Sequence, residues 1–439
     1  MTPLSARSAL KPGITPPAPP GCRPQSTSSR VRERWWSMSN LFLLGCDPEL
    51  TPGKAALLIS CRTAFAPRRL RPALGDFSGS VYPVTPLPEA LEQMADELQR
   101  GDIAVLTGGD PLFFGIGRRL IELFGPDLII HPALSAPQTA CARFLEPWDD
   151  ACFISLHGRD DDNFAARILR RPKTIVFTDH RRTPALIAQR LLETGAGIGI
   201  AQENIVMMIA EDLGTPKERL TKGCPREIAE MRFSTLNIVI IKHKRPPPTA
   251  DFVLGLNENN IRHSRGLITK DEVRAATLHH LRLPKQGVLW DIGAGSGSIS
   301  LEAARLCPEL RIFAVERQPE EQDNITANIR RYQSGNITLV KDQAPEALKS
   351  LPRPERIFIG GSGGRLTEII NFAAAALAPQ GIMVVNAVIS STRDKAPALL
   401  HQAGMRVQTT TIQVSRAPFP PETDEIINFK PITIITGKK

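Results

Sequence analysis

The sequence VLWDIGAGSGS, residues 288–298, decides the fold of the second half of this chain. Its first three residues are apolar and indicate the end of a buried strand, and the apolar run at 299–306 suits a helix. A strand, a glycine turn and a helix in this order form the ligand-binding crevice of doubly wound α/β sheets. Glycine lets the backbone pass close to a ligand, because it has no Cβ. The stretch therefore predicts a binding turn at the carboxyl end of a strand.

The spacing of the glycines separates two classes of cofactor. Dinucleotide-binding turns have the pattern G-x-G-x-x-G. Here the acidic residue Asp291 precedes glycines at alternate positions, namely Gly293, Gly295 and Gly297. This D-x-G-x-G-x-G pattern resembles the first motif of class I S-adenosylmethionine methyltransferases. Glu316 ends the strand-like sequence IFAVE and is placed to accept hydrogen bonds from the hydroxyls of a ribose. The alternative is a tight turn that binds no ligand.

The length and composition predict a soluble protein of two domains. A chain of 439 residues is too long for one hydrophobic core, and two domains of about 200 residues are expected. No apolar run reaches the roughly 18 residues that a membrane-spanning helix needs, so no membrane partner is expected. The seven cysteines include no C-x-x-C pair, which argues against a metal site or a disulfide framework and favours the cytoplasm.

The positive charge is concentrated at the start of the chain. Residues 1–39 hold six basic side chains and one acidic side chain, which is +5 of the net charge of +9. The segment is rich in proline and serine and is predicted to be disordered. Met38 is favoured as the true start. The remaining +4 and the two tyrosines offer little for stacking on bases, so no nucleic-acid partner is expected.

Segments with strand and helix patterns alternate along both halves, which predicts an α/β fold throughout. The proline-rich sequence HKRPPPT at 243–249 indicates a stiff linker. We therefore expect a disordered tail at 1–39, a first domain at 40–243, a linker at 244–255 and a second domain at 256–439.

The second domain is expected to form a sheet of seven strands that ends in an antiparallel hairpin. One of its helices is predicted to begin after Thr269, a residue type that is favoured at N-caps. Asp271 and Glu272 then fall in the first turn, where acidic groups suit the helix dipole. Ligands bind outside the carboxyl ends of such strands, so the loops after the strands are the candidate sites.

The loop after the fourth predicted strand, IGGSGGRL at 359–366, combines glycines with a basic residue. Consecutive exposed N–H groups form a nest that suits a carboxylate or phosphate. A plain flexible loop is the alternative. The next strand ends in VNAV, where the asparagine either faces the cleft or is a buried residue with its own partners. The candidates for contact with a substrate are Gly361, Ser362, Gly363, Gly364, Arg365 and Asn386.

Three further loops follow predicted strands. In KDQAPEAL, Asp342 or Gln343 is placed to bond an adenine, or is merely the start of a helix. In the first half, TGGDPLFFG at 107–115 offers exposed backbone groups for a polar ligand, or is an ordinary turn. His157 and Arg159 of SLHGRD are either ligands or surface groups.

These motifs together resemble the precorrin-6Y C5,15-methyltransferase (decarboxylating) family, the fused two-domain enzymes of corrin synthesis. The second half matches through ITKDEVRA, WDIGAGSGSISLE, AVER, APEAL, FIGGSGG and VNAV, in this order across 267–388. The first half resembles the tetrapyrrole methylase fold through GCDPELT, TGGDPLFFGIG, PALSAPQTACARFLEPW and SLHGRD. The two matches cover nearly everything after residue 40.

The resemblance implies a class I (Rossmann-like) methyltransferase domain after a tetrapyrrole methylase-like domain, each with a site for S-adenosylmethionine. In the second domain the implied cofactor residues are Thr269, Asp291, Gly293, Gly295, Gly297, Glu316, Gln343 and Ala344. In the first domain they are Gly45, Asp47, Pro48, Gly108, Gly109, Asp110, Ser135 and Ala136. The family usually has G-x-G-P-G-D-P-E-L where this chain has the shorter LLGCDPEL.

The resemblance also implies a reaction. Methyl groups go to C5 and C15 of a tetrapyrrole, precorrin-6B or its cobalt form, and the acetate of ring C loses CO₂ to give precorrin-8. The carbon nucleophile belongs to the macrocycle, so no catalytic residue is assigned and the protein mainly positions the reactants. A homo-oligomer is expected.

Two alternatives stay open. In one, only the second domain is catalytic and the first binds the tetrapyrrole, as its shortened loop allows. In the other, the chain methylates RNA, against which the lack of a basic, aromatic-bearing surface counts.

Overall fold

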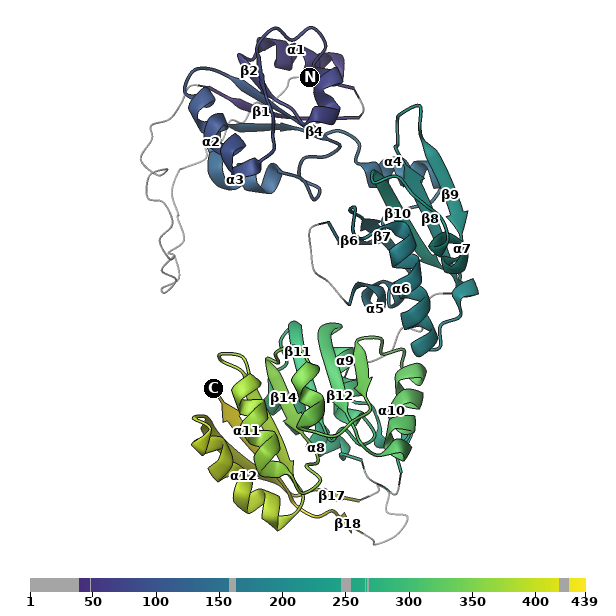
Figure 1. The fold of residues 1–439 in the computed structure, drawn as a ribbon, viewed down its shortest axis with the longest axis vertical. Coiled ribbons are helices and arrows are strands. Elements are labelled where there is room, and N and C mark those ends of the chain that lie inside the picture. The colour runs from purple at the N-terminus through teal and green to yellow at the C-terminus, as the bar shows by residue number, and fades with distance from the viewer. Residues whose placement is uncertain are drawn as a thin grey trace, which may run out of the picture.

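The computed structural model describes residues 39–47, 49–157, 163–245, 254–264, 266, 268–417 and 426–439. The predicted tail at 1–39 lies outside them except for Ser39, as do Pro48, Arg159 and residues 246–253 of the predicted linker. Two sheets of five strands and one of seven lie one after another along the long axis of the molecule (Figure 1). We call residues 39–245 the N-terminal half and residues 254–439 the C-terminal half.

The first sheet is parallel, with the strand order β3-β2-β4-β1-β5. Its central strands β1 and β4 are continuous apolar runs, as expected of strands that are covered on both faces. Met94 and Leu98 of α2 (Leu87–Leu98) are buried. The elements are β1 (Leu41–Cys46), α1 (Pro52–Ser60), β2 (Thr63–Phe65), β3 (Ser80–Tyr82), α2 (Leu87–Leu98), β4 (Ile103–Gly108), α3 (Gly117–Phe124) and β5 (Leu128–His131).

The second sheet is mixed, with the order β6-β7-β10-β8-β9. Only β6 and β7 run parallel, and the other neighbours are antiparallel. The elements are α4 (Ala136–Phe144), β6 (Cys152–Ser155), α5 (Phe164–Leu169), β7 (Lys173–Phe177), α6 (Pro184–Gly197), β8 (Ile205–Glu211), β9 (Arg219–Gly223), α7 (Pro225–Ala229) and β10 (Asn237–His243).

The third sheet has seven strands in the order β13-β12-β11-β14-β15-β19-β16, of which β19 runs antiparallel to both neighbours. Its strands are β11 (Gln286–Ile292), β12 (Glu309–Val315), β13 (Ile337–Val340), β14 (Arg356–Ile359), β15 (Ile382–Ala387), β16 (Arg406–Ile412) and β19 (Ile432–Lys438), and β17 (Ser415–Arg416) and β18 (Ile427–Asn428) form a separate ribbon. The helices are α8 (Asp271–Leu281), α9 (Ser298–Leu306), α10 (Pro319–Arg331), α11 (Leu366–Ala376) and α12 (Ser390–Gln402). None of the described helices is long and apolar enough to cross a membrane.

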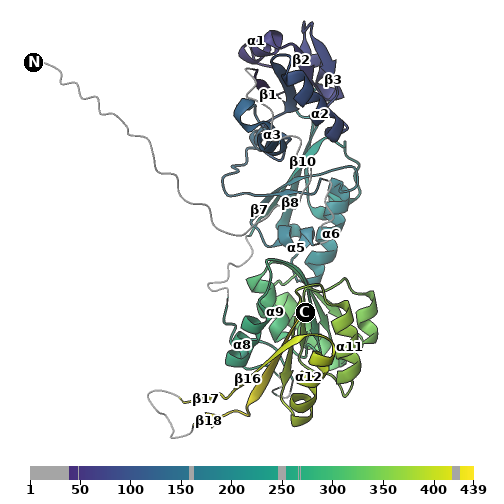
Figure 2. The ribbon, with the colours of Figure 1, turned by 90° about the vertical axis from the view of Figure 1, so that its left-hand side faces the viewer.

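The N-terminal half docks on the amino ends of the strands of the third sheet. Arg170 donates hydrogen bonds to the carbonyl of Ala304 at 2.9 Å and to Oδ1 of Asn336 at 2.6 Å. Arg167 pairs with Glu309, the first residue of β12, at 2.7 Å. Burial at this contact lowers the pKa of Arg170 to about 10. The carboxyl ends of the parallel strands therefore lie on the side away from the contact (Figure 2).

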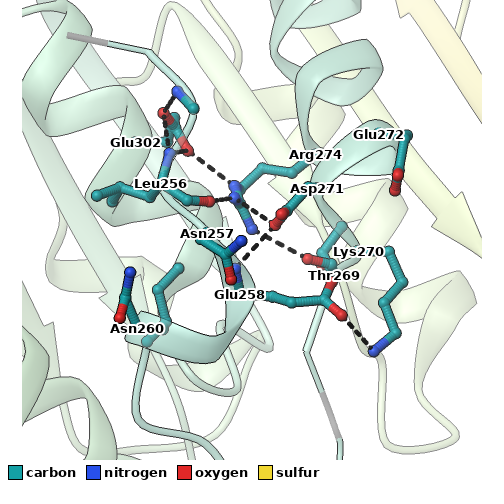
Figure 3. Close-up of polar contacts among 12 residues, drawn as sticks. Leu256, Asn257, Glu258, Asn260, Thr269, Lys270, Asp271, Glu272, Arg274 and Glu302 are labelled. Carbon is teal, nitrogen blue, oxygen red and sulfur yellow. Dashed lines mark hydrogen bonds and ion pairs between the residues drawn. The ribbon is translucent and has the colours of Figure 1, made fainter. Parts of the chain in front are cut away.

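A buried ion pair fixes the segment that leads into the third sheet (Figure 3). Arg274 of α8 and Glu302 of α9 are each 1% exposed, and Nε of Arg274 donates to Oε2 of Glu302 at 2.8 Å. The guanidinium also donates to the carbonyl oxygens of Leu256 and Thr269 and to Asp271. Glu302 in turn accepts a bond from the N–H group of Leu256. Because both charges are compensated, the pair holds the segment around Leu256 against α8 and α9.

The prediction that Thr269 caps a helix is wrong by one residue. Helix α8 begins at Asp271, and its N-cap is Lys270, whose side chain makes no capping bond. Instead, Nζ of Lys270 donates to Oε1 of Glu258 at 3.0 Å. The carbonyl of Thr269 is held by Arg274 at 3.1 Å. These tertiary contacts set the start of the helix in place of the local side-chain cap.

Arg274→Met should lower the free energy of unfolding by about 3–5 kcal/mol, because it leaves a buried carboxylate without its partner. The double variant Arg274→Met/Glu302→Leu should recover part of this loss, since no charge then stays buried. Urea denaturation of the full-length chain measures both. The control is Arg190→Met in an exposed pair with Glu193, which should change stability by less than about 0.5 kcal/mol. A loss for Arg274→Met as small as that of the control would contradict the buried-pair assignment.

Candidate active site

A cavity of about 200 Å³ lies at the carboxyl ends of β11 to β14. It is bounded by the loops that follow these four strands, and by Ile369 of α11. Of the residues predicted from sequence, the loops bring together in its lining Gly293, Glu316, Asp342, Gln343, Ala344, Gly361, Ser362 and Gly363. Strand ends as far apart in sequence as Ile292 and Ile359 thus form one site.

Two glycine loops meet through their backbones at this cavity. Gly293 follows β11 with φ +67°, and Gly361 follows β14. A Cβ added to Gly293 would lie 2.3 Å from the carbonyl oxygen of Gly361. No side chain fits at position 293, so glycine is required there both for the left-handed φ and for the close contact.

Glu316 links the ends of β11 and β12. Its carboxylate accepts bonds from the N–H groups of Gly295 at 2.9 Å and Gln318 at 2.9 Å, one on each oxygen. The side chain is 7% exposed and lines the cavity. Each carboxylate oxygen has a second lone pair, so this group can still accept bonds from a pair of ligand hydroxyls.

Asp291 is fully buried behind the glycine turn. Its Oδ2 accepts bonds from Oγ of Ser300 at 2.6 Å and from the N–H group of Ser300 at 3.2 Å. Its Oδ1 has no partner among the described residues. Burial raises the pKa of Asp291 to about 7, against the opposing bonds from Ser300 and with a smaller contribution from the charge of Glu316. An uncompensated buried oxygen beside a glycine turn is a feature that a polar ligand or water can satisfy.

Other predicted residues lie outside the cavity lining. Asn386 is 8% exposed and donates from Nδ2 to Oγ1 of Thr277 at 2.9 Å, so it is a buried residue with its own partner. Arg365 donates to Glu346 at 2.6 and 2.8 Å and also to Glu368. Gly295, Gly297 and Gly364 have positive φ angles and shape the turns beside the cavity.

Arg317 also lines the cavity and was not predicted from the sequence. A signal was present, because Arg317 directly follows Glu316 at the carboxyl end of a predicted strand. Its guanidinium, however, lies beside Gly363 of the loop after β14, a neighbour that the sequence does not reveal.

The predicted residues of the first half also converge, at the carboxyl ends of β1, β4 and β5. A Cβ added to Gly45 would lie 2.3 Å from the carbonyl oxygen of Gly109, and one added to Gly109 would lie 3.1 Å from Cα of Ser135. Nζ of Lys54 donates to the carbonyl oxygens of Gly45 and Pro132, each at 2.9 Å, and so joins the end of β1 to the loop after β5.

Several of these residues have local roles in the structure. Ser135 is the N-cap of α4, in a capping box with Gln138, and Ala136 is the first residue of that helix.

Oδ1 of Asp110 accepts from the N–H group of Leu112 at 2.8 Å, which stabilises the turn after Gly109. The N–H group of Asp47 donates to the carbonyl of Glu49 at 3.2 Å. Gly108 lies under Arg69, because a Cβ there would be 2.8 Å from Nη2. His157 is exposed.

Comparison with known families identifies two methyltransferase-type domains in the chain. Residues 50–229 match the Tetrapyrrole (Corrin/Porphyrin) Methylases, and residues 261–433 match the Precorrin methyltransferase domain. The chain is 32% identical over 318 residues to a Precorrin-6Y C(5,15)-methyltransferase [decarboxylating] of Sinorhizobium sp, which covers 72% of this chain and 75% of that protein. The chain therefore belongs to the precorrin-6Y C5,15-methyltransferase (decarboxylating) family.

Shorter proteins resemble one part of the chain. A Cobalt-precorrin-6B C(15)-methyltransferase (decarboxylating) of Salmonella typhi is 36% identical over 149 residues, which is 34% of this chain and 77% of that protein. A crystal structure of precorrin-6y C5,15-methyltransferase from Geobacter metallireducens GS-15 is 42% identical, with a TM-score of 0.42, and covers 43% of this chain and all of that one.

Asp291→Asn should remove a pH-dependent part of the stability. The folded pKa of about 7 lies above the ordinary value of 3.8, so folding favours the protonated acid, and the stabilisation present at low pH is lost as the pH rises. The asparagine does not titrate. The free energy of unfolding of the variant minus that of the wild type should therefore increase between about pH 4 and pH 7. Urea denaturation across this range measures the difference, with the exposed Asp394→Asn as control. A difference that stays flat would show that Asp291 does not titrate in this range.

Proposed function

We propose that this chain transfers methyl groups from S-adenosylmethionine to C5 and C15 of a corrin precursor and removes the carboxyl group of the ring C acetate as CO₂. The product would be precorrin-8 or its cobalt form. The relatives that match 72% of this chain carry both positions in their names. The shorter relatives are named for C15 methylation and decarboxylation alone. We assign these two steps to the C-terminal half, which matches the Precorrin methyltransferase domain, and the C5 transfer to the N-terminal half.

The observation that carries this proposal is the cavity between the two glycine loops. We assign the third sheet to the class I (Rossmann-like) methyltransferases, whose ligands bind at the carboxyl ends of the strands. Glu316 would accept the ribose hydroxyls, and Gln343 and Ala344 would contact the adenine. The buried, unpartnered Oδ1 of Asp291 and the turn at Gly293 fit a polar ligand that lies against the backbone. S-adenosylmethionine supplies an activated methyl group when it is bound.

The chain itself would contribute positioning. A macrocycle carbon is the nucleophile, so no side chain has to become one, and we assign no catalytic residue. The geometry that matters is the in-line approach of this carbon to the methyl group. Holding two reactants in such an approach can lower the activation free energy by up to about 7–11 kcal/mol. The loops around the cavity are the elements that would supply it.

A second candidate function is supported by Lys54. In it, only the C-terminal half transfers methyl groups, and the N-terminal half binds the tetrapyrrole. The ammonium group of Lys54 joins the end of β1 to the loop after β5 by donating to the carbonyl oxygens of Gly45 and Pro132. These loops flank the predicted cofactor residues of the first half.

Mass spectrometry of the products separates the two functions. The full-length chain is incubated with S-adenosylmethionine and precorrin-6B, with and without cobalt. The proposed function predicts a product that has gained two methyl groups and lost one CO₂. A product with one methyl group and the same loss of CO₂ after exhaustive incubation would support the second candidate. No methyl transfer to either form would exclude both.

At pH 8, above the pKa of about 7 for Asp291, Asp291→Ala and Glu316→Ala should each weaken the binding of S-adenosylmethionine by about 1.5–3 kcal/mol, the range for hydrogen bonds to charged groups. Calorimetric titration of the full-length chain measures this. The control is Glu193→Ala, an exposed acid on α6 far along the chain from the cavity, which should leave the affinity unchanged. Wild-type affinity in both pocket variants would contradict the assignment of the glycine turn as the cofactor site.

A further inference from the structure

The glycine loop after β14, residues 360–364, lies beside a guanidinium from the neighbouring loop. A Cβ added to Gly363 would lie 3.0 Å from Cζ of Arg317, and the φ angle of Gly363 is +56°. Arg317 is exposed, and it lines the same cavity as Gly361, Ser362 and Gly363. The glycine at 363 therefore both allows the turn and leaves room for the arginine.

The guanidinium of Arg317 makes no hydrogen bond or ion pair within the described part of the chain. Its neighbour Glu316 is bonded to the N–H groups of Gly295 and Gln318 instead. Arginine presents five N–H donors in a planar fork that matches a carboxylate. Here these donors are free to meet a ligand at the cavity.

Arg365, which directly follows this loop, already has partners for its donors. Two of its nitrogens donate to the carboxylate of Glu346, at 2.6 and 2.8 Å, and Glu368 accepts two further bonds. These pairs hold the pKa of Glu346 at about 2 and raise that of Arg365. A ligand carboxylate would have to displace two protein carboxylates to reach this arginine.

The loop offers further donors. The N–H groups of Gly360 and Gly361 are used by the carbonyl of Ile292. Those of Ser362, Gly363 and Gly364 have no hydrogen-bond partner among the described residues. Successive free N–H groups in a turn with positive φ angles form a concavity that suits an anion. An anion at this loop would have both these N–H groups and the guanidinium of Arg317, which lies beside Gly363, as donors.

We propose that Arg317, together with the free N–H groups of residues 362–364, binds a carboxylate of the reactants at the mouth of this cavity. The inference rests on the proposed function, which provides two sources. One is a carboxylate side chain of the tetrapyrrole, and the other is the carboxylate of the cofactor's methionine. The chemistry is the same, and the source is decided by which reactant loses affinity when the arginine is removed.

Steady-state kinetics of C15 methylation and decarboxylation by the full-length enzyme test this proposal. Arg317→Ala should raise the KM of the tetrapyrrole, or that of S-adenosylmethionine, by about 10- to 100-fold, as expected for losing a charge-assisted contact. The value of kcat should change by less than about threefold, because the contact is made in the ground state as well. Arg317→Lys should recover part of the loss, since an ammonium keeps the charge but not the fork.

Arg190→Ala is the control, because it removes an exposed arginine of α6 that pairs with Glu193 and lies outside the cavity lining. Its KM values should stay within about twofold of wild type. Equal effects of Arg317→Ala and Arg190→Ala in an active enzyme would overturn the inference. If the wild-type chain transferred no methyl group, the proposed function itself would be wrong. That result is distinguishable from a failure of the Arg317 inference, which is judged only in an active enzyme.

Binding measurements separate a carboxylate contact from a contact with the nucleoside. If the cofactor's carboxylate is the ligand, Arg317→Ala weakens S-adenosylhomocysteine but leaves 5′-methylthioadenosine, which lacks the carboxylate, unchanged. If the tetrapyrrole carboxylate is the ligand, neither compound is affected, and only the tetrapyrrole KM rises. Equal weakening of both nucleosides would overturn the proposal, because the guanidinium would then contact the adenosine.

Discussion

The contact between two glycine loops at the carboxyl ends of β11 and β14 is the constraint on which the C-terminal site depends. The carbonyl oxygen of Gly361 occupies the place where a Cβ of residue 293 would lie, at 2.3 Å. This approach lets the loop after β14 lie against the turn after β11. Glu316, bonded to the N–H group of Gly295, lines the cavity beside these two loops. Backbone-to-backbone contact of this kind tolerates no side chain, because interiors are packed to the density of organic crystals.

The architecture separates the parts of the C-terminal half that hold the chain together from those that form the site. Arg167 and Arg170 contact Glu309, Ala304 and Asn336, which lie near the amino ends of the strands of the third sheet. The cavity lies at the carboxyl ends of these strands. Strand β12 has seven residues, so it spans roughly 20 Å between its amino and carboxyl ends. The contact with the N-terminal half therefore lies at the amino ends of the strands and does not cover the cavity at their carboxyl ends.

The sequence allowed the backbone of the site to be predicted and left the pairing of its side chains open. Asp291, the alternate glycines and Glu316 stand at strand ends, a position that hydrophobic patterns mark directly. Asn386 was ambiguous because its partner Thr277 is 109 residues away. Arg365 was predicted to meet a substrate, but its pairing with Glu346 across 19 residues arises from the fold. The division of the first half into a parallel and a mixed sheet was not predicted either, since strand patterns do not encode which strands become neighbours.

Calorimetry with S-adenosylhomocysteine and the Gly293→Ala variant tests most directly whether the glycine turn is the cofactor site. The added Cβ would clash with Gly361, so the variant should stay folded in its other elements and bind one equivalent fewer than the wild-type chain. Gly404→Ala is the control, because Gly404 also has a positive φ, +79°, but nothing lies within 4 Å of an added Cβ. It should bind as the wild type does. If Gly293→Ala bound S-adenosylhomocysteine with the wild-type stoichiometry and affinity, the cofactor would not lie between the two glycine loops.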